Sequence, residues 1–161
     1  MDESHRHPYI QARNQRLDPV LYESTGQPVF ITICAHDKSR PFDDEALADE
    51  VVECLLAERK LFGCEVYAYC LMSDHLHMLS CPSIDGKSVL TYVDRFKGKS
   101  TRIAWNHGIR GKLWQPRSYD RIVRREDSLL AIAEYILLNP VRQGLGEDYR
   151  WCGLLDPMPL G

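Results

Sequence analysis

The stretch EVYAYCLM-SD-HLHMLSC, residues 65–81, decides the fold class. Two apolar segments, 65–72 and 75–81, are rich in aromatic and aliphatic side chains and flank the polar pair Ser73-Asp74. Two such segments separated by two turn-forming residues are typical of an antiparallel β-hairpin. The sequence therefore predicts a hairpin at the centre of the chain.

Outside this hairpin, apolar spacing predicts two more strands and three helices. Strands are expected over 28–35 and 119–124, and helices over about 43–62, 88–107 and 126–139, where Pro140 ends the last one. The first six elements follow the order of the ferredoxin-like split βαβ arrangement. We therefore expect an α+β fold with helices packed on an antiparallel sheet, followed by a C-terminal helix that carries Tyr135.

Composition bounds the class of protein. With 161 residues, 44% hydrophobic and 27% charged, the chain is expected to form one globular domain over 28–155, between an arm over 1–27 and a tail over 156–161. It has no apolar run of membrane-spanning length and no apolar leader segment. Its six cysteines form no C-x-x-C pair, which is typical of reduced thiols in a cytoplasmic protein.

Positive charge is concentrated in one part of the chain. Residues 87–125 hold eleven Lys or Arg against two Asp, a net charge of +9, although the whole chain carries −3. Such asymmetry indicates a surface that faces a polyanion. The alternative is a set of solvated helix faces. The candidate DNA-binding residues in this segment are Arg95, Lys97, Lys99, Arg102, Arg117, Arg121, Arg124 and Arg125.

Two histidines in the hairpin are candidate metal ligands. His75 and His77 are two residues apart on a predicted strand, so their imidazoles share one face while Leu76 points into the core. A co-facial His pair suits a divalent metal, although surface or core histidines give the same pattern.

The last predicted helix adds two more candidates. Tyr135 and Asn139 lie four residues apart on one side of its apolar stripe. A Tyr beside a carboxamide suits a nucleophile beside a metal ligand, and it equally suits a packing aromatic and a helix cap. With the His pair and the basic segment, however, it indicates phosphoryl transfer on nucleic acid, with the tyrosine oxygen as nucleophile.

Three ordered blocks resemble the single-tyrosine HUH transposases of small bacterial insertion sequences, in particular the REP-associated tyrosine transposases. The blocks are YCLMSDHLHML (69–79), LWQPRSYD (113–120) and EYILLNPVRQGL (134–145). The resemblance implies that His75, His77 and Asn139 bind a divalent metal, Mg²⁺ or Mn²⁺, and that Tyr135 is the nucleophile. It also implies nicking and rejoining of single-stranded DNA, beside a hairpin or palindromic repeat, through a 5′-phosphotyrosine.

Other readings of the same residues remain open. A non-catalytic nucleic-acid-binding module would keep the basic segment without needing Tyr135 or the His pair. A metal phosphodiesterase with a water nucleophile would turn over without a covalent adduct. Three aromatic residues, Trp105, Trp114 and Tyr119, are candidates for stacking on a base, although Trp is more often buried. No membrane partner is expected, and a homodimer is an open alternative to a monomer.

Overall fold

The fold is built on one five-stranded antiparallel sheet. The computed structural model describes residues 18–85, 87–124 and 127–159. The strands are β1 (Val29–Cys34), β2 (Cys64–Leu71), β3 (His75–Pro82), β4 (Tyr119–Ile122) and β5 (Cys152–Leu154). Their order in the sheet is β4-β1-β3-β2-β5, and every neighbouring pair is antiparallel.

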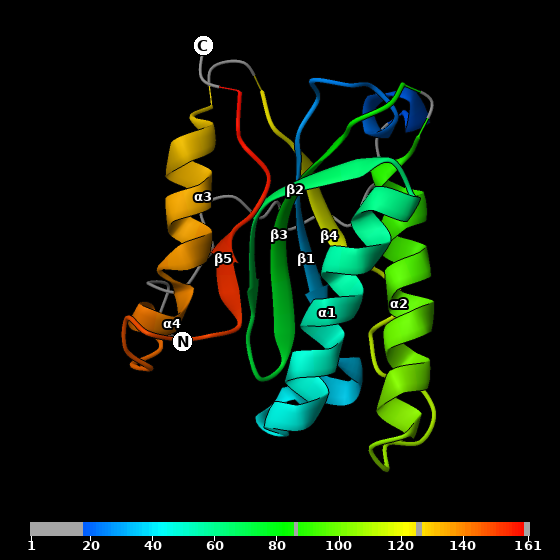
Figure 1. The fold of residues 1–161 in the computed structure, drawn as a ribbon, viewed down its shortest axis with the longest axis vertical. Helices are drawn as coiled ribbons and strands as arrows, with labels where there is room; N and C mark the ends of the chain where they lie inside the picture. The colour runs from blue at the N-terminus through cyan, green and yellow to red at the C-terminus, as the bar shows by residue number, and fades with distance from the viewer. Residues whose placement is uncertain (1–17, 86, 125–126, 160–161) are drawn as a thin grey trace.

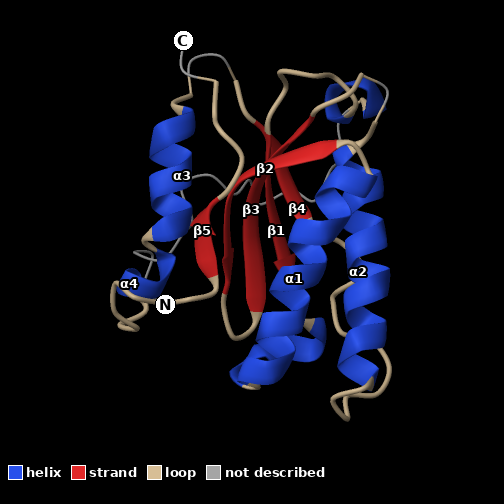
Figure 2. Ribbon diagram, viewed as in Figure 1, coloured by secondary structure: helices blue, strands red, loops and turns tan. Residues whose placement is uncertain are grey.

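The helices lie on both faces of the sheet. Helices α1 (Glu45–Leu61) and α2 (Val89–Trp105) cover one face, and α3 (Leu129–Leu137) with the short α4 (Asn139–Arg142) lies on the other (Figures 1 and 2). The ferredoxin-like fold expected from the sequence is therefore confirmed, with α3, α4 and β5 added after it. In the described parts of the chain, no helix combines the length and the apolar character needed to cross a membrane.

Local sequence signals explain where the long helices begin. Asp44, Ser88 and Ser128 each precede a helix, and each side chain accepts a hydrogen bond from a backbone N–H in the first turn. Helix α1 stops before Gly63, whose positive φ of 61° few other residues adopt without strain. These caps fix the ends of the helices to within one or two residues of the predicted bounds, except in α3.

The last predicted helix is divided into two. Helix α3 ends at Leu137, and α4 begins at Asn139 with Pro140 in its first turn. The physical reason is that Pro140 has no N–H to donate to the turn before it, whereas it is well tolerated at the start of a new helix. The expected single helix through Asn139 is thus corrected to two segments that meet at Leu138.

Alternation along β3 separates two apolar cores. Leu76 and Met78 pack with α1 and α2, while Leu79 and Cys81 pack with α3 on the other face. His75 and His77 share the phase of Leu79, so both histidines lie on the α3 face and Leu76 points away from them. The strand period predicted this division correctly.

Candidate functional site

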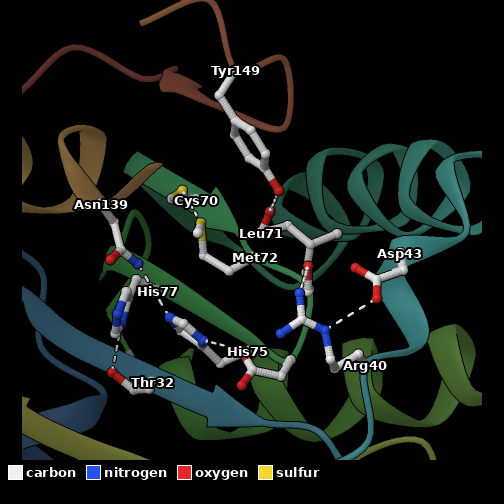
Figure 3. Close-up of polar contacts among 12 residues, drawn as sticks. Thr32, Arg40, Asp43, Cys70, Leu71, Met72, His75, His77, Asn139 and Tyr149 are labelled. Carbon is white, nitrogen blue, oxygen red and sulfur yellow. Dashed lines mark hydrogen bonds and ion pairs between the residues drawn. The ribbon is translucent and has the colours of Figure 1, made fainter. Parts of the chain in front are cut away.

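The paired histidines lie at one end of β3, and an oxygen contacts the Nδ1 atom of each ring (Figure 3). His77 Nδ1 is 2.8 Å from Thr32 Oγ1 on the neighbouring strand β1. His75 Nδ1 is 2.7 Å from Asp74 Oδ1 in the hairpin turn. The two ring centroids are 4.6 Å apart. Contacts of this kind set the orientation of an imidazole and are typical of histidines that bind a metal through Nε2.

The segment from α3 to α4 brings two more side chains to the histidines. Asn139 Nδ2 lies 3.1 Å from His75 Nε2, and the ring of Tyr135 lies 6.4 Å from that of His77, centroid to centroid. His77 and Asn139 are only 4% and 5% exposed, whereas His75 and Tyr135 are half-buried. The structure therefore brings together the four residues that the sequence analysis singled out, from two parts of the chain about 60 residues apart.

Both ring nitrogens of His75 have a polar partner. Nδ1 contacts the Asp74 carboxylate, and Nε2 contacts the side-chain amide of Asn139. The contact with His75 also holds the pKa of Asp74 below its ordinary value, so this carboxylate stays charged in mildly acidic solution. His75 thus presents its Nε2 atom toward Asn139 at the start of α4.

His77 occupies the middle of a row that crosses all five strands. The register places Tyr119, Thr32, His77, Cys70 and Cys152 directly opposite one another on β4, β1, β3, β2 and β5. Directly opposed residues of antiparallel strands project to the same face. Phe30 stacks on the His77 ring, with centroids 5.7 Å apart, and helps to fix it. His77 is therefore held by the central part of the sheet.

Arg142 is part of the site, and the sequence analysis did not identify it. Its guanidinium carbon lies 3.9 Å from the centroid of the Tyr135 ring, and Nη2 donates a 2.6 Å hydrogen bond to the Tyr135 carbonyl oxygen. A cation therefore covers the ring of the candidate nucleophile. No local signal could have found Arg142, because the predicted helix ended at Asn139 and the two residues lie in separate helices.

The predicted DNA-binding residues divide into two groups. Three of them bind other parts of the chain. Lys97 Nζ donates to the carbonyl oxygens of Gln115 and Pro116. Lys99 pairs with the buried carboxylate of Glu58, and Arg121 pairs with Asp127.

The other members of the set are Arg95, Arg102, Arg117 and Arg124, which are exposed, and Arg125, which lies outside the described residues. Helix α2 carries Arg95 and Arg102 and packs on the face opposite α3. The structure therefore does not bring these α2 cations next to Tyr135.

The donor set at the histidines limits which metals it can suit. In the parts of the chain that the structure describes, no three His, Cys, Asp or Glu side chains gather in a group able to hold a metal. Two imidazoles and one amide are the donors that the site offers. This set differs from the closed Cys/His sites of structural zinc, which hold the metal through four protein ligands.

Comparison with protein families matches residues 27–139 to the IS200-like transposases. The match covers more than half of the chain and includes Tyr135 and the residues around it. The chain belongs to this family. The resemblance to transposases seen in the three sequence blocks is therefore confirmed, and IS200-like transposase is the class of DNA-processing protein to which it is assigned.

Solved structures share the fold of this IS200-like chain. A REP-associated tyrosine transposase bound to a REP hairpin superposes with a TM-score of 0.66 and 18% identity, over 81% of this chain and 78% of that one. A candidate transposase from Deinococcus radiodurans R1 gives a TM-score of 0.52 and 22% identity, over 70% of this chain and 91% of that one. No curated protein matches the sequence significantly.

Proposed function

We propose that the protein is a metal-dependent strand transferase that nicks and rejoins single-stranded DNA through a 5′-phosphotyrosine at Tyr135. One observation carries this proposal: Tyr135, Asn139 and the two histidines converge on one face of the sheet, although packing alone requires no such meeting. Membership of the IS200-like family supports the coarser assignment to transposition.

The residues at the site fit a divalent cation. His75 and His77 would bind it through Nε2, since Thr32 and Asp74 contact the Nδ1 atoms. Asn139 would add its amide oxygen after a rotation of the amide group, whose nitrogen and oxygen differ little in shape. Mg²⁺ and Mn²⁺ are the cations we propose, because both bind amide and phosphate oxygens and keep coordination positions for the substrate. When bound, the cation would polarise the scissile phosphodiester.

Tyr135 supplies the nucleophile in the proposed reaction. Its Oη forms a bond to phosphorus and loses the phenolic proton, the P–O3′ bond breaks, and the departing 3′ oxygen takes up a proton. The products are a 5′-phosphotyrosine and a free 3′-hydroxyl. Attack by another 3′-hydroxyl on the phosphotyrosine restores a phosphodiester and the tyrosine, so rejoining needs no ATP.

Single-stranded DNA next to a hairpin is the proposed substrate. The REP-associated transposase with the same fold is bound to a REP hairpin, which supports a structured DNA partner for this chain.

The test is formation of a covalent adduct. The chain is incubated with Mn²⁺ and a 5′-labelled or 3′-labelled hairpin that carries single-stranded extensions, and the products are separated in SDS. We expect label in the protein band only when it lies 3′ of the nick, and no adduct with Tyr135→Phe. The matched control is Tyr149→Phe, which alters a tyrosine outside the His cluster. Nicking by Tyr135→Phe at the normal rate would contradict the role of Tyr135 as the nucleophile and favour a water nucleophile.

A further inference from the structure

A groove between the C-terminal half of α2 and the segment that follows has no role in the proposed strand transfer. Its volume is about 540 Å³, and its walls include Trp105, Arg102, Lys112 and Gly98. Of the two tryptophans on the walls, Trp114 is 3% exposed and belongs to the core, whereas Trp105 is 52% exposed. An exposed Trp on a concave surface is a feature that core packing does not explain.

The groove has the chemistry of a nucleobase site. The Trp105 indole N–H donates a 2.8 Å hydrogen bond to the Gly111 carbonyl oxygen, which holds the ring as a wall. A Cβ at Gly98 or Gly111 would meet no atom within 4 Å, so both glycines leave space open. The lining includes three cationic residues and no acidic one. A flat aromatic wall with cations around it matches an unpaired base and its phosphates.

Two residues that line the groove also contact the end of β1, next to the strand-transfer site. Trp114 bridges to Ala35, and Gln115 N–H donates to the Cys34 carbonyl oxygen at the end of β1. Cys34 is the register partner of His75. From Pro116, which lines the groove, the chain continues to Tyr119, which lies in the same row across the sheet as His77.

We propose that this groove binds one unpaired nucleobase of the DNA, stacked on Trp105, with the adjoining phosphates on Arg102 and Lys112. The inference rests on the proposed single-stranded DNA substrate and adds a second contact on a different part of the molecule. It also gives Arg102 of α2 a function, although α2 lies on the other face of the sheet from Tyr135.

The experiment compares DNA affinities of the full chain and its variants. The probe is a DNA hairpin with single-stranded extensions, in which one abasic nucleotide is moved through the unpaired positions. For the wild type we expect one position where loss of the base weakens binding about tenfold. Trp105→Ala should bind intact DNA about tenfold more weakly and lose sensitivity to that position. Trp105→Phe keeps an aromatic wall and should retain most of the affinity.

A second variant covers the case in which Trp105→Ala fails to fold. Gly98→Leu adds a side chain in the open space, removes no contact and improves helix propensity, so we expect a folded protein with a filled groove and the same weakened binding. Wild-type affinity in both Gly98→Leu and Trp105→Ala, or weakening only by Arg102→Ala and Lys112→Ala, would overturn the base site. Failure of the wild type to form an adduct, with the abasic profile intact, would instead refute the strand transfer alone.

Discussion

The guanidinium group of Arg142 lies over the ring of Tyr135, with its carbon 3.9 Å from the ring centroid, and donates a hydrogen bond to the carbonyl oxygen of the same residue. The first contact joins α4 to the side chain of α3, and the second joins it to the backbone. Because α3 and α4 are separate helices, Arg142 is the side chain that ties the proposed nucleophile to the segment carrying Asn139.

Replacing Arg142 should impair the proposed nicking more than folding. With Arg142→Ala we expect the rate of adduct formation at saturating DNA to fall about tenfold, because the Tyr135 ring loses a cation–π contact that is worth about 0.5–1 kcal/mol or more once desolvated. Arg142→Lys should recover little, since an ammonium cannot stack as a planar guanidinium does. The measurement is single-turnover kinetics in SDS gels.

Arg150 offers a matched control for Arg142. It also stacks on an aromatic ring, that of Trp151 at 4.6 Å, and pairs with Asp49, away from Tyr135. Arg150→Ala should leave the adduct rate at the wild-type level. Equal losses of adduct rate in both variants would show that Arg142→Ala acts through the loss of a surface charge and not through its contact with Tyr135.

Metal removal should stop nicking without unfolding the domain. EDTA is expected to abolish the adduct and leave the melting temperature within about 2 °C, because two apolar cores hold the fold independently of the His pair. Mn²⁺ titration followed by electron paramagnetic resonance should show one site in the wild type and strongly weakened binding in His77→Ala. Unfolding by EDTA would indicate a structural metal instead.

Thr32 provides a finer test of the metal site. Thr32→Val keeps the shape of the side chain and removes the hydroxyl that contacts His77 Nδ1. We expect Mn²⁺ affinity to fall about tenfold or more, which is the usual effect of losing a group that orients a metal-binding histidine. Unchanged affinity in a folded Thr32→Val protein would mean that stacking on Phe30 alone holds the His77 ring.

Lys99 and Arg102 should respond differently to alanine, although they are three residues apart on α2. Lys99→Ala leaves the Glu58 carboxylate, 5% exposed, without its cation, so we expect a loss of about 1–3 kcal/mol in unfolding free energy and an unchanged salt slope of DNA binding. Arg102→Ala should keep stability and reduce the log–log salt slope by about 0.7, the value for one phosphate contact to a single strand. Urea unfolding and salt titrations measure both quantities. The opposite pattern would make Lys99 the DNA contact.

Much of the architecture could be predicted because its signals are local. The Ser73-Asp74 turn, the helix caps and the period of two in β3 each depend on a few neighbouring residues, and they placed both histidines on the correct face. The three-residue strand β5 was missed, since Cys-Gly-Leu shows neither length nor alternation and pairs only because β2 offers an edge.

The partners of the site residues could not be predicted from local patterns. Thr32 meets His77 through a strand register between residues 45 positions apart. Lys99 was expected on the DNA surface because it lies in the basic segment and at helical spacing from Arg95 and Arg102, but the packing of α1 on α2 places Glu58 against it. Such contacts depend on which elements become neighbours, and the sequence pattern of one element does not contain that information.

The connection from β4 to β5 explains why α3, which carries Tyr135, lies over His77. The two strands form opposite edges of the sheet, so the chain between them must travel across its full width. Helix α3 lies on this crossing and packs on β2, β3 and β5. The segment is anchored in the sheet at both ends, by β4 at one edge and β5 at the other. Its middle part, which contains α3, therefore lies over the inner strands. Removing β5 would free the C-terminal end of this segment from the sheet. The histidines on β3 would stay in place, but Tyr135 would no longer be held next to them.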